Sequence, residues 1–87
     1  MNRAGGFDWD DAKAEANYRK HCVDFETASE VFDDPFAVER FDSLSPDHGE
    51  DRYLIIGMAG GRLLTVVYTE RSEVIRLISA RPATRRT

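Results

Sequence analysis

The side chains of this sequence that could do chemistry suit phosphate binding and proton transfer. Cleaving RNA without a metal needs a base for the 2′-hydroxyl, a cation for the charge on the phosphorane and an acid for the leaving oxygen. Groups of these kinds occur at seven positions: Lys20, His21, Arg52, Tyr68, Glu70, Arg76 and Arg81. Trp9 could stack a base, and Arg71 and Arg85 could contact further phosphates. The residue types permit metal-free RNA cleavage, but they do not identify the base or the acid.

Each of these residues also has a structural explanation. Tyr68 could be a half-buried aromatic of a sheet, Glu70 a charge beside a turn, and His21 a residue at the end of a helix. Trp9 stands between two aspartates at the start of a predicted helix, where it could staple that helix to the core. The arginines could be solvated edge residues that pair with acidic helices. Both interpretations stay open on residue type alone.

Other kinds of site find no support in the sequence. His21 and Cys22 are adjacent, His48 stands in a predicted loop, and no second cysteine completes a zinc set. The glycines of residues 57–61 lack the following helix and lysine of a phosphate-binding loop. No serine stands in a recognisable nucleophile elbow. We therefore expect neither a metal nor a cofactor.

The charged residues divide the chain into an acidic and a basic part. Residues 1–51 carry five Lys/Arg against fourteen Asp/Glu, a net charge of −9. Residues 52–87 carry seven Arg against two Glu, a net charge of +5, so that the whole chain has −4. A polyanion would be drawn to the second part, where every cation is an arginine, the side chain suited to bidentate phosphate contacts.

Length and composition predict one soluble domain over residues 1–87, with 41% hydrophobic and 32% charged residues. No apolar run approaches the ~18 to 20 residues of a membrane span. The acidic segment Asp8–Asp11 stands where a signal peptide would have its apolar core. The single cysteine, Cys22, cannot form an internal disulfide. We expect a cytoplasmic protein without membrane contact.

Two helices are predicted in the first part of the chain. Asp10 is a good N-cap for a helix over residues 11–20, and Asp24 is one for a shorter helix over 25–32 that stops before Pro35. In the first helix, the alanines at 12 and 16 are expected to pack inward, whereas Asn17 falls on a polar side together with lysines.

The rest of the sequence is typical of strands joined by turns. A short first strand is possible at residues 7–9, and further strands are expected over residues 36–41, 52–59, 63–70 and 74–80. Gly60-Gly61 is the strongest hairpin turn, and residues 42–51 form an acidic loop. The order predicts an α+β fold, with two N-terminal helices on one face of a mainly antiparallel sheet of three to five strands. The opposite face would be an open binding surface.

The last hairpin leaves its register undecided, because its turn Arg71-Ser72-Glu73 is not a strong two-residue signature. A slip by one residue exchanges the two faces of a strand. The open face would then carry either Arg76 with Thr65, Thr69 and Ser79, or Tyr68 with Arg81.

The sequence also resembles the BrnT family of toxins, in six segments that follow one another over nearly the whole chain. These are Phe7-Asp-Trp-Asp-Asp-Ala-Lys13, Asn17-Tyr-Arg-Lys-His21, Val23-Asp-Phe-Glu-Thr-Ala28, Val31-Phe-Asp-Asp-Pro35, Arg62-Leu-Leu-Thr-Val-Val-Tyr-Thr-Glu-Arg71 and Ile75-Arg-Leu-Ile-Ser-Ala-Arg-Pro-Ala-Thr-Arg85. Such toxins are halves of type II toxin-antitoxin systems. The resemblance implies a RelE-like fold and metal-independent endoribonuclease activity that arrests translation, acting on mRNA alone or on the ribosome.

The resemblance further implies neutralisation by a BrnA-type ribbon-helix-helix antitoxin encoded beside the toxin. Operator DNA would be bound only through that antitoxin, and the assembly could be a homodimer or a heterotetramer with it. In the family, the segment from Ser79 to Thr84 leads into a C-terminal helix, so a sequence ending at Thr87 implies a helix that is short or missing. A different class of function also fits the chain: a non-catalytic module that acts only in complex with a DNA-binding protein.

Overall fold

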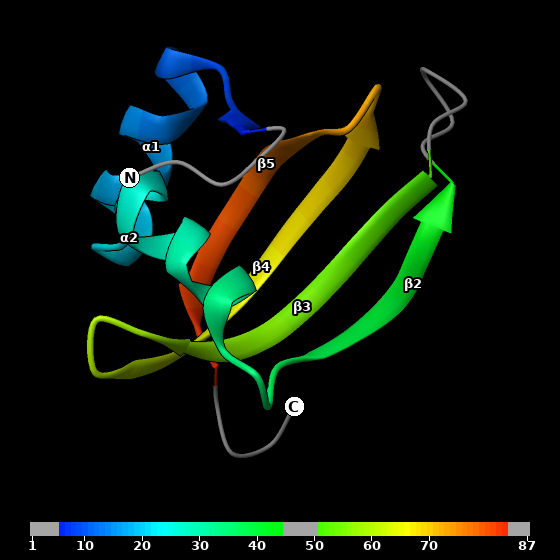
Figure 1. Cartoon of the computed structure of the whole chain (residues 1–87). Helices are drawn as coiled ribbons and strands as arrows, with labels where there is room; N and C mark the ends of the chain where they lie inside the picture. Colours follow the sequence, from blue (N-terminus) through cyan, green and yellow to red (C-terminus); the bar gives the residue numbers. More distant parts are fainter. Residues whose placement is uncertain (1–5, 45–50, 84–87) are drawn as a thin grey trace.

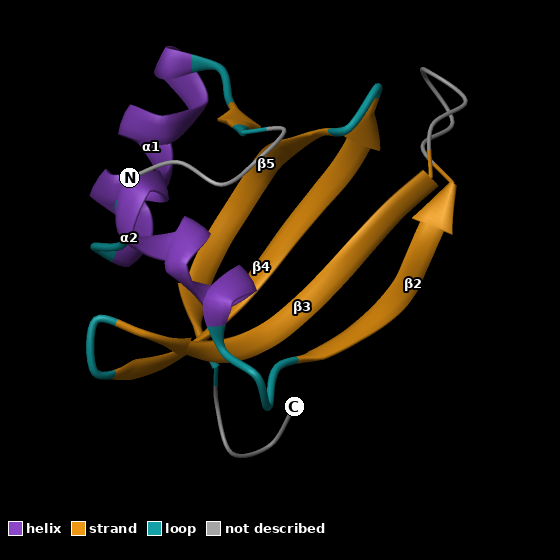
Figure 2. Cartoon of the chain, in the orientation of Figure 1, coloured by secondary structure: helices purple, strands orange, loops and turns teal. Residues whose placement is uncertain are grey.

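A five-stranded sheet with its helices on one face forms the protein (Figure 1, Figure 2). The computed structural model describes residues 6–44 and 51–83. Its elements in chain order are β1 (Phe7–Asp8), α1 (Asp11–His21), α2 (Phe25–Ala28), the 3-10 helix η1 (Ser29–Asp33), β2 (Val38–Leu44), β3 (Asp51–Ala59), β4 (Arg62–Arg71) and β5 (Val74–Pro82). The strand order is β1-β5-β4-β3-β2, and only the β1–β5 pair is parallel. The predicted α+β arrangement is confirmed.

Both predicted helix caps are present. Asp10 accepts hydrogen bonds from the backbone N–H groups of Ala12 and Lys13, at 2.8 and 3.2 Å. Asp24 accepts from the N–H of Thr27 at 2.9 Å. These side chains satisfy donors that have no partner inside the first turn of a helix, and so fix where each helix begins.

The packing of α1 differs from the prediction. Asn17 is the buried residue of the helix, whereas the alanines at 12 and 16 are exposed. The Asn17 amide nitrogen donates to the carbonyls of Val23 and Ala80, at 3.0 and 2.8 Å, and its oxygen accepts from the Ala80 N–H at 3.0 Å. Because all these polar groups are satisfied, a polar residue can occupy a buried position, which hydrophobic periodicity alone does not reveal.

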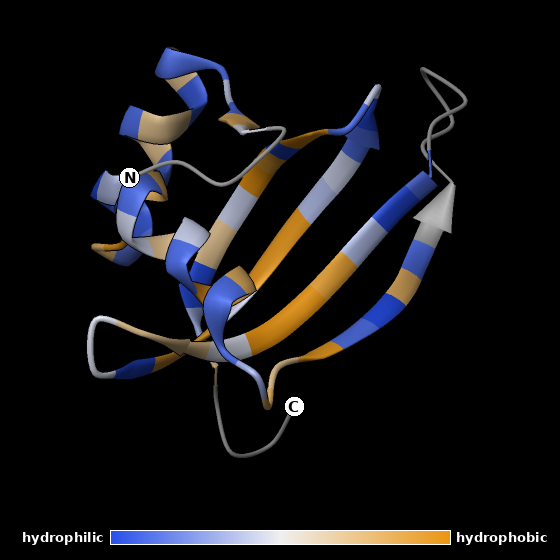
Figure 3. Ribbon diagram, in the orientation of Figure 1, coloured by the Kyte–Doolittle hydropathy of each residue, from blue (hydrophilic) through white to orange (hydrophobic). Residues whose placement is uncertain are grey.

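The core lies between the helices and one face of β3, β4 and β5. Its largest fully buried side chains are Phe25, Leu64, Leu77, Val23, Val31 and Val66. Figure 3 shows the hydrophobic residues along the middle of β3 and β4, with hydrophilic residues toward the upper strand ends. Gly57 permits close contact with the segment that precedes β2, because a Cβ there would lie 2.9 Å from the Ala37 Cβ. The other face of the sheet carries no helix in the described part of the chain.

The two hairpin turns differ in chemistry. Gly60 and Gly61 form the predicted turn between β3 and β4, with φ of +58° and +78°. Between β4 and β5, Ser72 and Glu73 take the same left-handed region, at 50° and 70°, although neither is a glycine. The second turn is therefore also a two-residue turn, with Arg71 paired to Val74.

The strand between the helices and the acidic loop begins later than predicted, at Val38 instead of residue 36. The Asp34 side chain accepts from the Phe36 N–H at 2.9 Å, and the Ala37 N–H donates to the Asp34 carbonyl at 3.1 Å. These bonds hold residues 34–37 in a turn. The tip of the acidic loop with His48, and the C-terminal residues that include Arg85 and the expected short or missing helix, lie outside the described residues.

Candidate functional site

A bulge in β5 brings two predicted phosphate-binding residues to the same face. Thr65 pairs with Arg81 and Thr69 pairs with Arg76, whereas the register shifts between Val67 and Tyr68, so that Ile78 has no partner. Thr65 and Thr69 are four positions apart on one strand and share a face. Arg76 and Arg81 therefore both lie on the face opposite the helices, which we call the open face.

Arg52 joins them from the next strand. Tyr53 pairs with Tyr68 across the antiparallel β3–β4 ladder, which makes Arg52 and Thr69 the following cross-strand neighbours. Thr69 pairs with Arg76, and Arg76 with Asp8 of β1. Across the open face the sheet thus presents a row of four residues, which we call the arginine row: Arg52, Thr69, Arg76 and Asp8.

Polar atoms in this row lack hydrogen-bond partners. The Arg52 Nε and the Thr69 Oγ1 are both buried, and neither has a partner within residues 6–44 and 51–83. Thr69 as a whole is only 3% exposed. A buried donor without an acceptor costs roughly 1–3 kcal/mol, so such groups are rare in folded proteins, and a catalytic role or a bound water or ion is the usual explanation for one.

Arg76 is held in place by an acidic partner. Its Nη1 lies 2.6 Å from the Asp8 Oδ2, and the two side chains are 33% and 53% exposed. An exposed pair of this kind adds little to stability. Its effect is to fix the direction of the guanidinium beside Thr69.

The open face also has a shallow depression next to this row. Its volume is about 390 Å³, and most of its lining is aliphatic or arginine: Val38, Arg40, Leu54, Ile56, Thr65 and Arg81. Arginines next to apolar surface can bind phosphates and also support the flat faces of bases.

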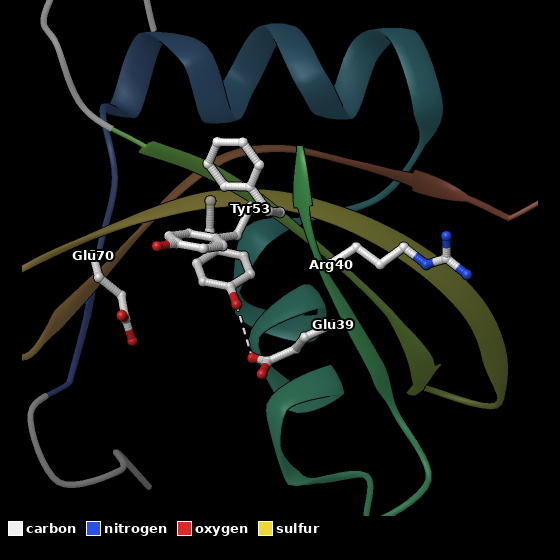
Figure 4. A pocket seen from close by; sticks show the side chains of 6 residues that line it. Glu39, Arg40, Tyr53 and Glu70 are labelled. Carbon is white, nitrogen blue, oxygen red and sulfur yellow. Dashed lines mark hydrogen bonds between the residues drawn. The ribbon is translucent and has the colours of Figure 1, made fainter. Parts of the chain in front are cut away.

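Tyr68 and Glu70 lie on the other side of the sheet. They line a pocket of about 300 Å³ with Glu39, Arg40, Phe41 and Tyr53 (Figure 4). The Tyr68 hydroxyl donates to the Glu39 Oε2 at 2.8 Å, and the Tyr53 hydroxyl donates to the Asp51 Oδ2 at 3.3 Å. We call this the acidic aromatic pocket. The position of this pocket decides which residue of the last hairpin lies on the open face: Arg76 lies there, whereas Tyr68 faces the helices.

Both tyrosines of the pocket ionise less readily than usual. Burial is the main cause of the raised pKa of Tyr68, followed by its hydrogen bond to Glu39 and by the negative charges of Glu39 and Glu70. The pKa of Tyr53 is also raised, by desolvation and then by the charge of Asp51 and the hydrogen bond to it. The surroundings of both hydroxyls are therefore negative, which disfavours a phosphate.

A line of aromatic rings supports this pocket from beneath the helices. Phe7 contacts Phe32 with ring centroids 5.3 Å apart, and Phe32 meets Tyr68 edge-on at 4.9 Å. Tyr68 stacks on Tyr53 at 5.6 Å, and Tyr53 meets Phe41 at 5.8 Å. The line runs from β1 to β2, and thus holds the pocket walls to the core.

The other predicted residues lie away from the arginine row. Lys20 is exposed and His21 is half-buried at the end of α1, while Arg71 is exposed at the end of β4. Trp9 is half-buried, with its ring 5.8 Å from that of Phe25 in an edge-on contact, as expected of a residue that staples the helix. The structure therefore places Arg52, Arg76 and Arg81 on one face of the sheet, with Arg81 opposite Thr65 and so four positions along β4 from Thr69, and separates all three from Tyr68 and Glu70.

Three residues that the sequence did not single out belong to these sites. Asp8 completes the arginine row, in which Thr69 lies beside Arg76 as one of the two predicted sets had it, and Glu39 and Tyr53 form much of the acidic aromatic pocket. Alternation along a strand could have paired Tyr53 with Tyr68 once the Gly60-Gly61 turn fixed the register. The position of Asp8 depends on a parallel contact with β5 that no local pattern indicates.

Two general features of the described residues complete the description. Their His, Cys, Asp and Glu side chains form no group of three or more that could hold a metal ion. No helix among residues 6–44 and 51–83 is long and apolar enough to cross a membrane.

Comparison with known families identifies the chain. Residues 9–87 match the family described as the ribonuclease toxin, BrnT, of type II toxin-antitoxin systems. A comparison with curated proteins finds no significant match. Because the match extends over nearly the whole length of 87 residues, the chain belongs to the BrnT family of ribonuclease toxins.

Proposed function

We propose that this toxin is a metal-independent endoribonuclease that binds RNA on its open face. Arg52, Arg76 and Arg81 would hold the scissile and neighbouring phosphates and stabilise the negative charge that develops on the phosphorane. Cleavage of mRNA, alone or on the ribosome, would arrest translation. The fold would then be of the RelE-like kind.

The observation that carries this proposal is the arginine row. Arginine fits phosphate oxygens with two parallel hydrogen bonds. The unpartnered Arg52 Nε and Thr69 Oγ1 are two further donors beside Arg76. A phosphate oxygen would supply the acceptor that both lack once the flanking side chains move aside to admit it. A phosphate on the open face would thus form more hydrogen bonds than it would form on an ordinary basic surface.

The proposal divides the chemistry between two sets of residues. The arginines bind the phosphate and stabilise charge. The sequence predicts proton transfer by Lys20, His21, Tyr68 or Glu70, which lie outside the arginine row. Single substitutions of those four residues decide which of them takes part, since removal of a general acid or base lowers the rate by roughly 100-fold or more.

The test is cleavage of RNA by the purified protein in the presence of a chelator. We expect Arg76→Ala and Arg81→Ala each to lower the cleavage rate by about 100-fold. The matched control is Arg19→Ala, which removes the same charge from an exposed helix position where Arg19 pairs with Glu15. Full activity in both open-face variants would refute the site, and activity that the chelator abolishes would refute metal independence.

We also propose that a BrnA-like ribbon-helix-helix antitoxin neutralises the toxin, and that operator DNA is bound only through it. A homodimer or a heterotetramer with the antitoxin is the proposed assembly. Expression of the toxin alone should stop growth and deplete cellular RNA, and co-expression of the neighbouring gene should restore growth. Unimpaired growth with intact RNA would instead favour a non-catalytic module that works only in a complex.

A further inference from the structure

The acidic aromatic pocket has the chemistry of a site for a cation. Figure 4 shows Glu39 and Glu70 on either side of the tyrosine rings, while Arg40 extends away from them. An ionised carboxylate offers about four acceptor positions, and Tyr68 occupies one of those on Glu39. The half-buried ring of Tyr53, which stacks on the buried Tyr68, adds the attraction that aromatic rings have for cations.

The dimensions of the pocket point to a single side chain. Its volume of about 300 Å³ is at the lower limit of pockets for small molecules, and it opens to solvent beside Phe41. A guanidinium group is flat, stacks on aromatic rings and binds carboxylates through a rigid fork of donors. Arginine therefore fits stacked tyrosines between two carboxylates better than the compact ammonium of lysine.

The neighbouring surface indicates that this side chain would come from a polypeptide. β2 is one of the two edge strands of the sheet, with β3 as its neighbour. The segment leading into β2 and along it exposes two large apolar residues, Phe36 at 86% and Phe41 at 58%, whereas the exposed Val38 lies in the depression of the open face. Apolar residues grouped on an edge strand are typical of protein interaction surfaces, because they would otherwise promote aggregation.

We propose that a partner polypeptide lies along the β2 edge and inserts an arginine side chain between Glu39 and Glu70. In this toxin the partner would be the protein antitoxin, a part of the inference that rests on the proposed function. The negative charge of the pocket complements a basic partner and repels RNA, so this surface is distinct from the open face.

The first experiment tests the pocket without the antitoxin. The probe is a short peptide with one arginine between two leucines, and its counterpart carries citrulline, which has the same shape without the charge. NMR shifts of the Tyr53 and Tyr68 ring protons report binding. We expect the arginine peptide to bind at least about fivefold more tightly than the citrulline peptide. Equal binding of the two peptides, or no binding of either, would overturn the proposal.

Variants show which carboxylates are responsible. The double variant Glu39→Gln with Glu70→Gln should remove the preference for arginine, while its amide oxygen can still accept the Tyr68 hydrogen bond. The control is Glu15→Gln with Glu26→Gln, which removes the same charge from exposed helix positions. A preserved preference in the first double variant, with an unchanged melting temperature, would contradict the site.

The second experiment uses the antitoxin produced from the neighbouring gene. We expect the Glu39→Gln, Glu70→Gln variant to bind it at least about tenfold more weakly than the control variant. If the wild-type toxin does not bind that protein, the proposed antitoxin is wrong, and the peptide experiment still decides the pocket. If both double variants bind it equally well, the antitoxin does not use this pocket.

Discussion

Arg76 and Arg81 stand five positions apart on β5, yet both lie on the open face, because Ile78 is left without a partner in the ladder. In a regular strand, residues separated by an odd number of positions point to opposite faces. A bulge inserts one extra residue and restores the alternation beyond it. The sequence left two alternative sets for this face, and the bulge places an arginine from each of them there.

Removal of the Asp8 carboxylate should strengthen RNA binding. Asp8 pairs with Arg76 at 2.6 Å and competes with a phosphate for that guanidinium. We expect Asp8→Asn to increase affinity for a non-cleavable RNA by about two- to fivefold and to steepen its dependence on salt. Fluorescence anisotropy at several salt concentrations measures both effects.

The control for Asp8 is Asp11→Asn, which removes the same charge from the exposed first turn of α1. An equal gain in affinity in the two variants would show that total charge, and not release of Arg76, is responsible. A loss of affinity in Asp8→Asn would show that the pair holds Arg76 in the orientation that RNA requires.

Asn17 should be among the most sensitive positions for stability. Its amide makes three hydrogen bonds, to the Val23 carbonyl and to both backbone groups of Ala80. Asn17→Ala would leave buried backbone groups unsatisfied, so we expect the free energy of unfolding to fall by about 2–4 kcal/mol. Urea denaturation measures this loss. Lys13→Ala, at an exposed position of the same helix, should change stability by less than about 0.5 kcal/mol.

Asn17 also shows which features of the structure can be predicted from the sequence and which cannot. Capping residues and the Gly60-Gly61 turn act locally, and the structure confirms them. The burial of Asn17 and the pairing of β1 with β5 depend on contacts between distant segments, which no spacing reveals. The same holds for the sites. The sequence indicates the arginines by type and charge, whereas the register and the bulge determine that Tyr68 is separated from them.

Asp34 should make stability depend on acidic pH. The backbone N–H groups of Met58 and Phe36 donate to its carboxylate and lower its pKa below the ordinary 3.8. A pKa that is lower in the folded state gives stabilisation that is present above the unfolded value and is lost as the pH falls through the folded value. We therefore expect Asp34→Asn to be less stable than wild type at pH 7.

Denaturation midpoints measured from about pH 7 down to about pH 3 check this prediction, because the difference between Asp34→Asn and wild type should narrow below about pH 4. A difference that stays constant over this range would show that the two hydrogen bonds stabilise the neutral carboxyl equally well.

Tyr68 should make the stability of the protein depend on alkaline pH. Burial, the hydrogen bond to Glu39 and nearby carboxylates raise its pKa in the folded protein. A raised pKa gives stability that is complete below the unfolded value of 10.0 and is lost as the pH rises beyond it. The free energy of unfolding of wild type should therefore fall more steeply between about pH 9 and pH 11 than that of Tyr68→Phe. Equal slopes would contradict the assigned environment of the hydroxyl.

The two sites share their backbone. Arg52 and Tyr53 are consecutive residues on β3, as are Tyr68 and Thr69 on β4, and in each pair one residue belongs to the open face and the other to the acidic aromatic pocket. A ligand on the arginine row and a ligand in the pocket would lie on opposite sides of the sheet, so a ternary complex is sterically allowed. An inhibitor bound in the pocket would be expected to act non-competitively, lowering turnover while the RNA concentration for half-maximal rate stays the same.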